Sequence, residues 1–186
     1  YNISKEFMDM FNFCEIVHQR RNHIEQLKKD NNYKGLFSIL DKCFRISYFI
    51  ELYPYIPEEQ FVDVFTLVYS FCEYNFDMLL TDNVLNKLRK LKPNLTKQQL
   101  INEGAEITDS IVTIYRGESD KSTDYKEGAL SWTLNYDIAT FFANRFSAKK
   151  PKVYKAQVNI KDIILYIDRE EEVLVEAKDL IDVKSI

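Results

Sequence analysis

The sequence predicts an α+β protein with a helical N-terminal part and a compact, β-rich C-terminal part. Residues 1–104 carry apolar side chains at helical spacing, and the whole chain of 186 residues has only four glycines and four prolines. From residue 105 onward, short segments rich in β-branched and aromatic residues predict strands. The change of pattern near Gly104 therefore predicts a helical region over 1–104 and a separate domain over 105–186.

The first region is expected to contain three longer helices, a shorter one and a last short turn. They are predicted over about 4–30, 33–52, 57–80, 82–92 and 96–103. Pro57 with Glu58 and Glu59 suits the first turn of the third helix. Thr96 followed by Gln99 has the spacing of a capping box. The inner face predicted for the second helix consists of Leu36, Phe37, Leu40, Phe44 and Tyr48.

The second region is expected to form a sheet with one substantial helix. Strands are predicted over 111–115, 130–133, 153–158, 163–167, 171–175 and 181–186. The helix is expected to begin after Asn135, whose side chain suits an N-cap, and to reach Phe146. Alternation of apolar and polar residues is clearest over 153–158, as in a half-buried strand.

Charge argues against indiscriminate binding of nucleic acid. The net charge is −4 and the isoelectric point is about 5.3, whereas such binding needs a basic surface. Basic residues cluster at 87–92 and 145–152. Solvated helix ends are the expected explanation, and a nucleic-acid patch is the alternative.

Three cysteines, Cys14, Cys43 and Cys72, lie far apart among apolar residues. We expect buried free thiols and a reducing compartment, the cytoplasm of the producing or the target cell, while the sequence leaves secretion open. His18 and His23 would lie about 140° apart around a helix, so no metal site is expected. There is no run of 18 apolar residues, so no membrane span is expected.

Arg116 and Gly117 end the strand predicted over 111–115. A guanidinium offers a planar fork of donors that matches phosphate oxygens. A glycine allows a ligand to approach the backbone closely. A surface arginine followed by a turn glycine is the alternative explanation for this pair taken alone.

Two hydroxyls flank the single tryptophan in the fragment Ser131-Trp132-Thr133. Alternation along a strand places Ser131 and Thr133 on one face and Trp132 on the other. The hydroxyls can orient a ribose or a catalytic carboxylate, and Trp132 is expected in the core. A strand with no ligand is the alternative.

An acidic run, Glu170-Glu171-Glu172, precedes Val173-Leu174-Val175. A period of two places Glu170 and Glu172 on one face and Glu171 on the other, although one bulge would exchange Glu171 with Glu172. Two nearby carboxylates can bind ribose hydroxyls, stabilise an oxocarbenium-like centre and raise one another's pKa. A solvated acidic run is the alternative.

Together these fragments resemble the arginine-serine-glutamate class of ADP-ribosyltransferases. Arg116 corresponds to the family's arginine, Ser131-Trp132-Thr133 to its Ser-Thr-Ser strand, and Glu170-Glu171-Glu172 to its Glu-x-Glu motif. The resemblance covers about residues 107–186. The chain departs from the family in the Trp132 position and in the 15 residues that separate Arg116 from Ser131, which implies a trimmed domain.

The resemblance implies NAD as substrate and no metal. Arg116 would bind the NAD phosphates, and the Gly117 backbone would hold the nicotinamide amide. Ser131, with Thr133 on the same strand, would position the nicotinamide ribose. Either Phe142 or Tyr125 would stack on the nicotinamide.

The resemblance also assigns the chemical step. Glu172 would bind the ribose 2′-hydroxyl and stabilise the oxocarbenium ion as nicotinamide leaves, while Glu170 would orient or deprotonate the acceptor. A glutamate two residues before the catalytic one resembles the arginine-modifying subgroup. Compact enzymes of this type occur among bacterial toxins and phage proteins.

The sequence thus predicts a mono-ADP-ribosyltransferase that modifies a macromolecule, with a protein side chain, arginine included, as the expected acceptor. An NAD glycohydrolase or a nucleic-acid ADP-ribosyltransferase is the first alternative. The second is a helical interaction protein with an inactive transferase-like domain. Residues 1–104 would bind a target, a partner or the catalytic cleft.

Overall fold

The computed structural model describes residues 5–72, 76–145 and 149–186, with side chains from Phe13 onward. The protein is α+β, with helices concentrated in the N-terminal part and an antiparallel sheet in the C-terminal part. Its packing divides the chain into two compact units, Tyr1–Thr81 and Asp82–Ile186. We call them the helical unit and the sheet unit.

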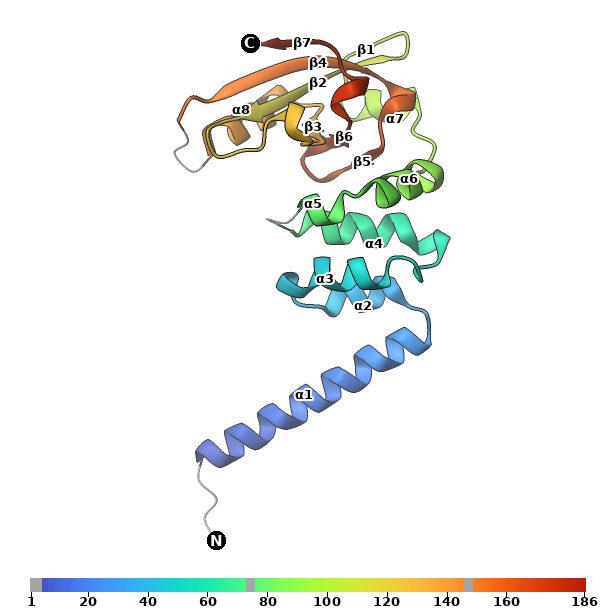
Figure 1. Ribbon diagram of the computed structural model, residues 1–186, viewed down its shortest axis with the longest axis vertical. Helices are drawn as coiled ribbons and strands as arrows, with labels where there is room; N and C mark the ends of the chain where they lie inside the picture. Colours follow the sequence, from blue (N-terminus) through green and yellow to red (C-terminus); the bar gives the residue numbers. More distant parts are fainter. Residues whose placement is uncertain (1–4, 73–75, 146–148) are drawn as a thin grey trace. The chain divides into compact units, whose positions relative to one another are not determined.

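Aromatic side chains fill the core of the helical unit. Its helices are α1 (Lys5–Lys29), α2 (Tyr33–Ile39), α3 (Lys42–Leu52), α4 (Glu58–Ser70) and α5 (Phe76–Leu79) (Figure 1). Phe49 of α3 is fully buried, and its ring centroid lies 5.9 Å from that of Phe61 and 6.1 Å from those of Phe37 and Phe65. Such edge-to-face and tilted pairs stabilise a core beyond the area that they bury.

The helix predicted over 33–52 is interrupted. Leu40 has an extended backbone with ψ 141°, and Asp41 takes the N-cap position of α3. The interruption changes the helical phase, so α3 buries Ile46 and Phe49 while Phe44 is 54% exposed. The prediction of Phe44 as a core residue was therefore wrong. The helix predicted over 57–80 likewise ends early as α4, and residues 73–75 lie outside the described part of the chain.

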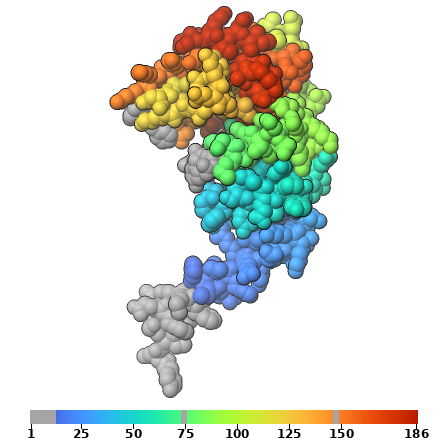
Figure 2. Space-filling model, in the orientation of Figure 1, coloured from blue at the N-terminus to red at the C-terminus, as the bar shows by residue number. Residues whose placement is uncertain are grey.

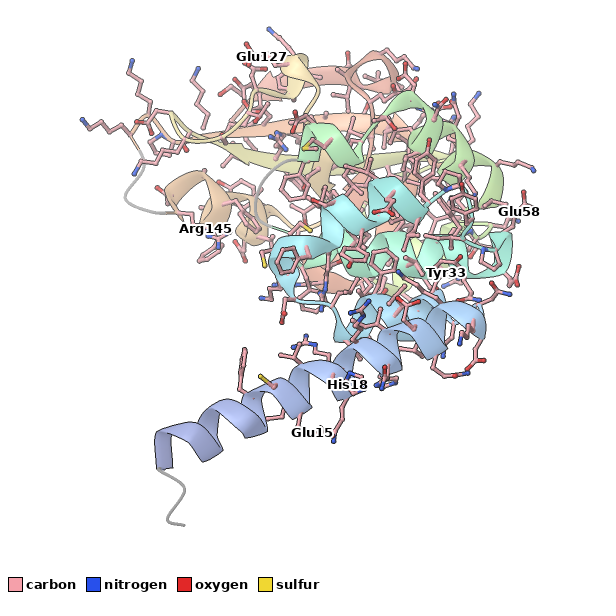
Figure 3. The ribbon with its side chains drawn as sticks, turned by 60° about the horizontal axis from the view of Figure 1, so that its bottom comes forward. Glu15, His18, Tyr33, Glu58, Glu127 and Arg145 are labelled. Atoms are coloured by element: carbon pink, nitrogen blue, oxygen red, sulfur yellow. The ribbon has the colours of Figure 1, made fainter. Side chains whose placement is uncertain are left out.

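In α1, the residues from Phe13 to His23 are exposed. Phe13 and Ile16 are both more than 60% exposed, and Glu15 and His18 also lie on this exposed stretch (Figure 3). The prediction of buried thiols was wrong for Cys14 and Cys43, which are exposed, because apolar spacing on a helix does not guarantee a covering partner. Cys72 is half-buried, and this burial raises the pKa of its thiol against the lowering effect of Arg45.

The sheet unit begins with two helices that the sequence assigned to the helical region, α6 (Asp82–Leu91) and α7 (Lys97–Asn102). Arg89 of α6 donates a hydrogen bond to Glu176, and the Lys92 ammonium donates to the carbonyl oxygens of Lys161 and Ile163. These polar contacts and the buried Leu100 of α7 tie both helices to the strands. The structural boundary therefore precedes the predicted one at residue 104.

The sheet is antiparallel throughout, in the order β5-β6-β3-β2-β4-β7, with β1 also paired to β2 (Figure 1). The bounds are β1 (Ile107–Thr108), β2 (Ile111–Glu118), β3 (Ser131–Thr133), β4 (Lys152–Asn159), β5 (Leu165–Ile167), β6 (Glu172–Leu174) and β7 (Ile181–Ser185). The helix α8 (Tyr136–Asn144) and short 3₁₀ turns also belong to the unit. The turns are η1 (Tyr125–Glu127), η3 (Ile160–Asp162), η4 (Arg169–Glu171) and η5 (Ala177–Asp179).

The two faces of the sheet have different partners. One face carries the main core of the unit, which includes Ile114, Trp132 and Val173 together with Leu100 of α7. The other face packs against α8, where Tyr115 contacts the small side chains of α8. We call these the core face and the α8 face. Trp132 is 1% exposed, so its predicted place in the core is confirmed.

The two capping residues predicted for α7 and α8 are confirmed. Thr96 and Gln99 form the capping box of α7, with both reciprocal hydrogen bonds present. The Asn135 side chain accepts hydrogen bonds from the backbone N–H groups of Asp137 and Ile138 at the start of α8. Phe146, the predicted end of this helix, lies outside the described residues.

Of the helices in residues 5–72, 76–145 and 149–186, none has both the length and the hydropathy that a membrane crossing requires.

Candidate functional site

The three fragments singled out in the sequence lie on three neighbouring strands, β2, β3 and β6. Tyr115 of β2 pairs with Thr133 of β3, and Thr133 in turn pairs with Glu172 of β6. Residues that are paired across antiparallel strands share one face of a sheet. The pairing therefore brings Thr133 and Glu172, 39 positions apart in the chain, side by side on the α8 face.

Ser131, two positions before Thr133, shares the α8 face with it and is half-buried, as is Glu172. The Thr133 hydroxyl is committed to the local backbone: it donates to the carbonyl of Glu170 at 2.8 Å and accepts from the N–H of Asn135 at 3.1 Å. Thr133 thus fixes the turn before β6 and the start of α8, while Ser131 lies at the opposite end of β3.

Arg116 belongs to the core face, because it alternates with Tyr115 along β2. Its side chain is only 10% exposed. Its Nε donates to Oε1 of Glu118 at 2.7 Å, and its two terminal nitrogens donate to the carbonyl oxygens of Ser131 at 2.6 Å and Thr123 at 2.7 Å. The guanidinium therefore joins β2, β3 and the segment that connects them.

Glu118 completes this arrangement, which we call the Arg116 clamp. Its side chain is 9% exposed, and its Oε1 also accepts from the N–H of Tyr125 at 2.8 Å. The clamp holds the segment 119–130 at two points. That segment also lies beside the 149–152 stretch on the surface (yellow and orange in Figure 2), where Lys149 donates from its N–H to Asp120 at 2.7 Å.

Gly117 faces α8. A Cβ placed on Gly117 would lie 1.9 Å from the carbonyl oxygen of Ala139 and 2.5 Å from the nitrogen of Ala143. A side chain at this position is therefore excluded by α8 itself. The sequence analysis explained the glycine by the close approach of a ligand, whereas the helix occupies that space here.

The acidic run does not alternate as predicted. Glu170 and Glu171 both have left-handed backbones, with φ of 65° and 47°, and form the turn η4, while Glu172 begins β6. Such conformations are strained for residues other than glycine. Glu170 is exposed, with its Oε1 3.7 Å from Nε of Arg169, while Glu171 is half-buried.

A polar cleft of about 590 Å³ opens where β3 ends and β6 begins. Glu171 lines it, and its Oε1 lies 3.4 Å from Nδ2 of Asn135. The cleft also has an aromatic wall, because the rings of Tyr115 and Tyr136 meet edge to face with centroids 5.7 Å apart. The remaining lining residues are Asn102, Glu103, Gly104, Glu106 and Leu134.

A cation already lies against this aromatic wall. The Lys155 ammonium is 5.6 Å from the centroid of the Tyr115 ring and 3.8 Å from Oε2 of Glu106. Such positions over an aromatic ring are favourable for cations. The walls of the cleft therefore combine carboxylates with ring faces.

A smaller cavity of about 170 Å³ shares Asn102 and Glu103 with the cleft and is lined by Tyr166 and Asp168. Burial of the Tyr166 hydroxyl raises its pKa well above the ordinary value, and the nearby carboxylates of Glu103 and Asp168 act in the same direction. Tyr166 therefore stays neutral over the physiological range.

The two aromatic candidates for stacking on nicotinamide lie elsewhere. Phe142 is half-buried on α8 beside Phe141, at 5.5 Å between centroids, and the guanidinium of Arg145 lies 5.6 Å from its ring (Figure 3). Tyr125 packs against Trp132 and Tyr154 on the core face. Neither is among the residues that line the cleft.

Sequence reasoning missed most of the residues that line the cleft, although Glu171 belongs to the acidic run that it singled out. Tyr115 directly precedes Arg116, and Tyr136 directly follows the N-cap Asn135. An aromatic residue beside an N-cap at a strand end is a usable signal, but it is common in proteins. Glu103 and Glu106 carried no local signal, because only the packing of α7 against the sheet brings them there.

The described residues contain no group of three or more His, Cys, Asp or Glu side chains arranged to hold a metal ion. No protein-family model, curated protein or solved structure matches this chain.

Proposed function

We propose that the protein is a mono-ADP-ribosyltransferase that moves ADP-ribose from NAD to a macromolecular acceptor. The observation that carries the proposal is the alignment of β2, β3 and β6. It puts Glu172 directly opposite Thr133, with Ser131 on the same face, and the Arg116 guanidinium 2.6 Å from the Ser131 carbonyl. Adjacent strands thus carry three residue types that suit work on a dinucleotide, with Ser131 and Glu172 on the α8 face and Arg116 on the core face.

In this proposal the NAD diphosphate lies toward the Ser131 end of β3. Arg116 has five N–H donors, of which three are used by Glu118, Ser131 and Thr123. Two donors are left on the core face, where the Arg116 side chain is 10% exposed, and the clamp holds the guanidinium in a fixed orientation. Fixed donors bind an anion at a smaller entropy cost than mobile ones.

The nicotinamide ribose would lie at the Thr133 end of β3, beside the cleft. Ser131 would position it by hydrogen bonding. The cleft at this end has a volume within the range of about 300–1,000 Å³ typical of small-molecule sites. Its aromatic wall, Tyr115 and Tyr136, replaces Phe142 and Tyr125 as the surface that would stack on a planar ring.

The reaction breaks the bond between the ribose C1′ and the nicotinamide nitrogen, and the bonding electrons leave with nicotinamide. The Glu172 carboxylate would stabilise the positive charge that develops on the ribose. The acceptor nucleophile then bonds to C1′ and loses its proton to a carboxylate of the Glu170–Glu171 turn. Electrostatic stabilisation of this kind contributes about 10²–10³-fold in rate.

Water is the second candidate acceptor. Tyr136, Glu103 and Gly104 at the cleft are all exposed, so water has access to the position that an acceptor would take. Hydrolysis would make the protein an NAD glycohydrolase that uses the same residues up to the departure of nicotinamide.

The experiment that tests the proposal is incubation of the full chain with NAD while nicotinamide release is followed by chromatography. We expect release by wild type, a loss of about 100-fold in Ser131→Ala or Glu172→Gln, and no loss in Glu127→Gln, an exposed control on η1 (Figure 3). Biotinylated NAD and a cell lysate then separate the candidates. Labelled protein means transfer, and free ADP-ribose without labelled protein means hydrolysis.

A further inference from the structure

We infer that one end of the sheet unit carries a binding surface for single-stranded nucleic acid. The surface joins exposed cations to aromatic rings of α8, and we call it the basic surface. Its members are Arg145, Lys149, Lys150, Lys152, Phe141 and Phe142. Residues 146–148 lie outside the described part of the chain and are not included. The inference goes beyond the proposed function, because the binding needs neither NAD nor the residues of the cleft.

Strand pairing and helix packing bring these members to the same end of the sheet. Lys152 begins β4 and pairs with Glu118, the last residue of β2. The neighbouring Gly117 lies against the backbone of Ala143, in the last turn of α8. The C-terminal end of α8 and the start of β4 therefore lie together at the end of β2.

The backbone that carries the lysines is held by hydrogen bonds. The N–H of Asp120 donates to the carbonyl oxygen of Lys149 at 3.2 Å, and the N–H of Lys149 donates to the Asp120 carboxylate at 2.7 Å. Lys150 follows in a left-handed conformation with φ 53°, which is uncommon for residues other than glycine. The turn before β4 thus presents several cations from a fixed backbone.

The two basic clusters of the sequence differ in how the fold uses them. In the cluster 87–92, Arg89 is paired with Glu176, and the Lys92 ammonium donates to two carbonyl oxygens. In the cluster 145–152, a helix end explains only Arg145, the C-cap of α8. The three lysines lie in the turn and at the start of β4, and they take part in none of the ion pairs between described residues.

Nearby carboxylates do little to neutralise this charge. The stretch 145–152 contains no Asp or Glu. Glu118, which lies opposite Lys152 in the strand pair, is already bound by Arg116 at 2.7 Å. The Asp120 carboxylate accepts a backbone N–H. A chain with a net charge of −4 therefore keeps a local positive surface, the electrostatic feature that phosphate groups require.

Aromatic rings extend the basic surface along α8. Phe141 is 63% exposed, and its ring centroid lies 5.5 Å from that of Phe142. The guanidinium of Arg145 lies 5.6 Å from the Phe142 ring (Figure 3). Nucleic-acid bases stack on exposed rings, and a neighbouring arginine adds a cation–π contribution. Rings beside cations thus match both parts of a single strand, its bases and its phosphates.

The same part of α8 disfavours an anionic membrane as the partner. Asp137 and Asn144 are exposed and lie about one turn before and after Phe141, on the same side of the helix. A face that enters the membrane interface needs contiguous apolar residues and a basic polar side. A single exposed ring between polar residues suits a base better than a lipid bilayer.

The test uses the full chain without NAD and two fluorescein-labelled probes, a DNA dodecamer of thymidine and an RNA dodecamer of uridine. We expect fluorescence anisotropy to show binding of both, in the range of about 10⁻⁴–10⁻⁶ M. With three or four phosphate contacts, affinity should fall about 20- to 50-fold between 50 and 200 mM KCl.

Variants locate the binding. Lys149→Gln, Lys150→Gln and Lys152→Gln should each weaken it about three- to tenfold, and the triple variant should reduce the slope of log affinity against log salt by about 2. Phe141→Ala should weaken it about fivefold without a change in this slope. Lys97→Gln, an equal change of charge at an exposed residue of α7, should leave the affinity unchanged.

Three outcomes overturn the inference. The first is an absence of oligonucleotide binding at 50 mM KCl, with or without binding to vesicles that contain 30% phosphatidylserine. The second is binding that the triple variant retains in full. The third is equally tight binding of a glutamate dodecamer together with no effect of Phe141→Ala, which would indicate a general surface for polyanions. Nicotinamide release is measured separately, so none of these outcomes decides the proposed function.

Discussion

The two ends of β3 use polar residues in opposite ways. At the Ser131 end, Arg116 and Glu118 are about nine-tenths buried, and hydrogen bonds tie them to Ser131, Thr123 and Tyr125. At the Thr133 end, carboxylates and tyrosines line an open cleft. The first end is closed by internal contacts, and the second end is open to a ligand.

This comparison shows that a residue that stands out in the sequence is not necessarily one that a ligand can reach. Arg116 and Gly117 were the first residues of the motif, yet the guanidinium is largely used within the fold and the glycine is required by α8. Glu171 and Tyr136 gave weak signals and yet face the open space. A residue of the motif can thus act mainly by stabilising the strands that carry the site.

The largest expected effect is the loss of unfolding free energy when the ion pair at the closed end is removed. Arg116→Met removes the partner of a buried carboxylate, so Glu118 would lose its ion pair while it stays 9% exposed. Breaking a buried pair in this way costs about 3 kcal/mol of unfolding free energy. Urea unfolding followed by circular dichroism measures it.

The matched change at the open end is Glu171→Gln, which we expect to alter the unfolding free energy by less than about 0.5 kcal/mol. Equal losses for Arg116→Met and Glu171→Gln would contradict the distinction between a closed and an open end.

The second effect concerns the support of the closed end by α8. Gly117→Ala puts a Cβ 1.9 Å from the Ala139 carbonyl oxygen, so α8 must shift. We expect a loss of about 2–3 kcal/mol in thermal or urea unfolding. Gly128→Ala is the control, because a Cβ there meets nothing within 4 Å and only its φ of 96° is unfavourable, at about 1 kcal/mol. A smaller loss at Gly117 than at Gly128 would mean that α8 does not pack as described.

The smallest expected effect concerns Tyr166, which lines the smaller cavity beside the open end. Because burial and the nearby carboxylates raise the pKa of Tyr166 in the folded state, the unfolded chain releases this proton first as pH rises. The stabilisation is complete below the unfolded value near 10 and is lost progressively above it. Urea unfolding at pH 8, 10 and 11 should show a steeper decline for wild type than for Tyr166→Phe. Parallel declines would mean that Tyr166 is not held neutral by the fold.

Local signals predicted the elements of the fold well. The caps at Thr96 and Asn135 rest on side-chain hydrogen bonds to the nearest N–H groups, so the sequence is sufficient to find them. The burial of Trp132 likewise follows from alternation within a short strand. Apolar spacing predicted burial less well where a helix is interrupted, as at Leu40, or where no neighbouring element covers the helix face, as at Cys14.

The candidate site was predictable only in part. Alternation placed Ser131 with Thr133 on one face, but it could not describe Glu170 and Glu171, because two consecutive left-handed residues break the period of two. Glu103 lies far from Glu171 in the chain, and only the packing of α7 places both at one cleft. Long-range packing and rare backbone conformations are the two features that a single sequence does not encode locally.

The central claim is that Glu172, opposite Thr133, supports the departure of nicotinamide while Glu171 serves the acceptor. The most direct measurement compares nicotinamide release from NAD, without an acceptor, by wild type, Glu172→Gln and Glu171→Gln at equal folded concentration. The account predicts a loss of about 100-fold for Glu172→Gln and less than threefold for Glu171→Gln. Release by Glu172→Gln at the wild-type rate, or a loss confined to Glu171→Gln, would contradict it.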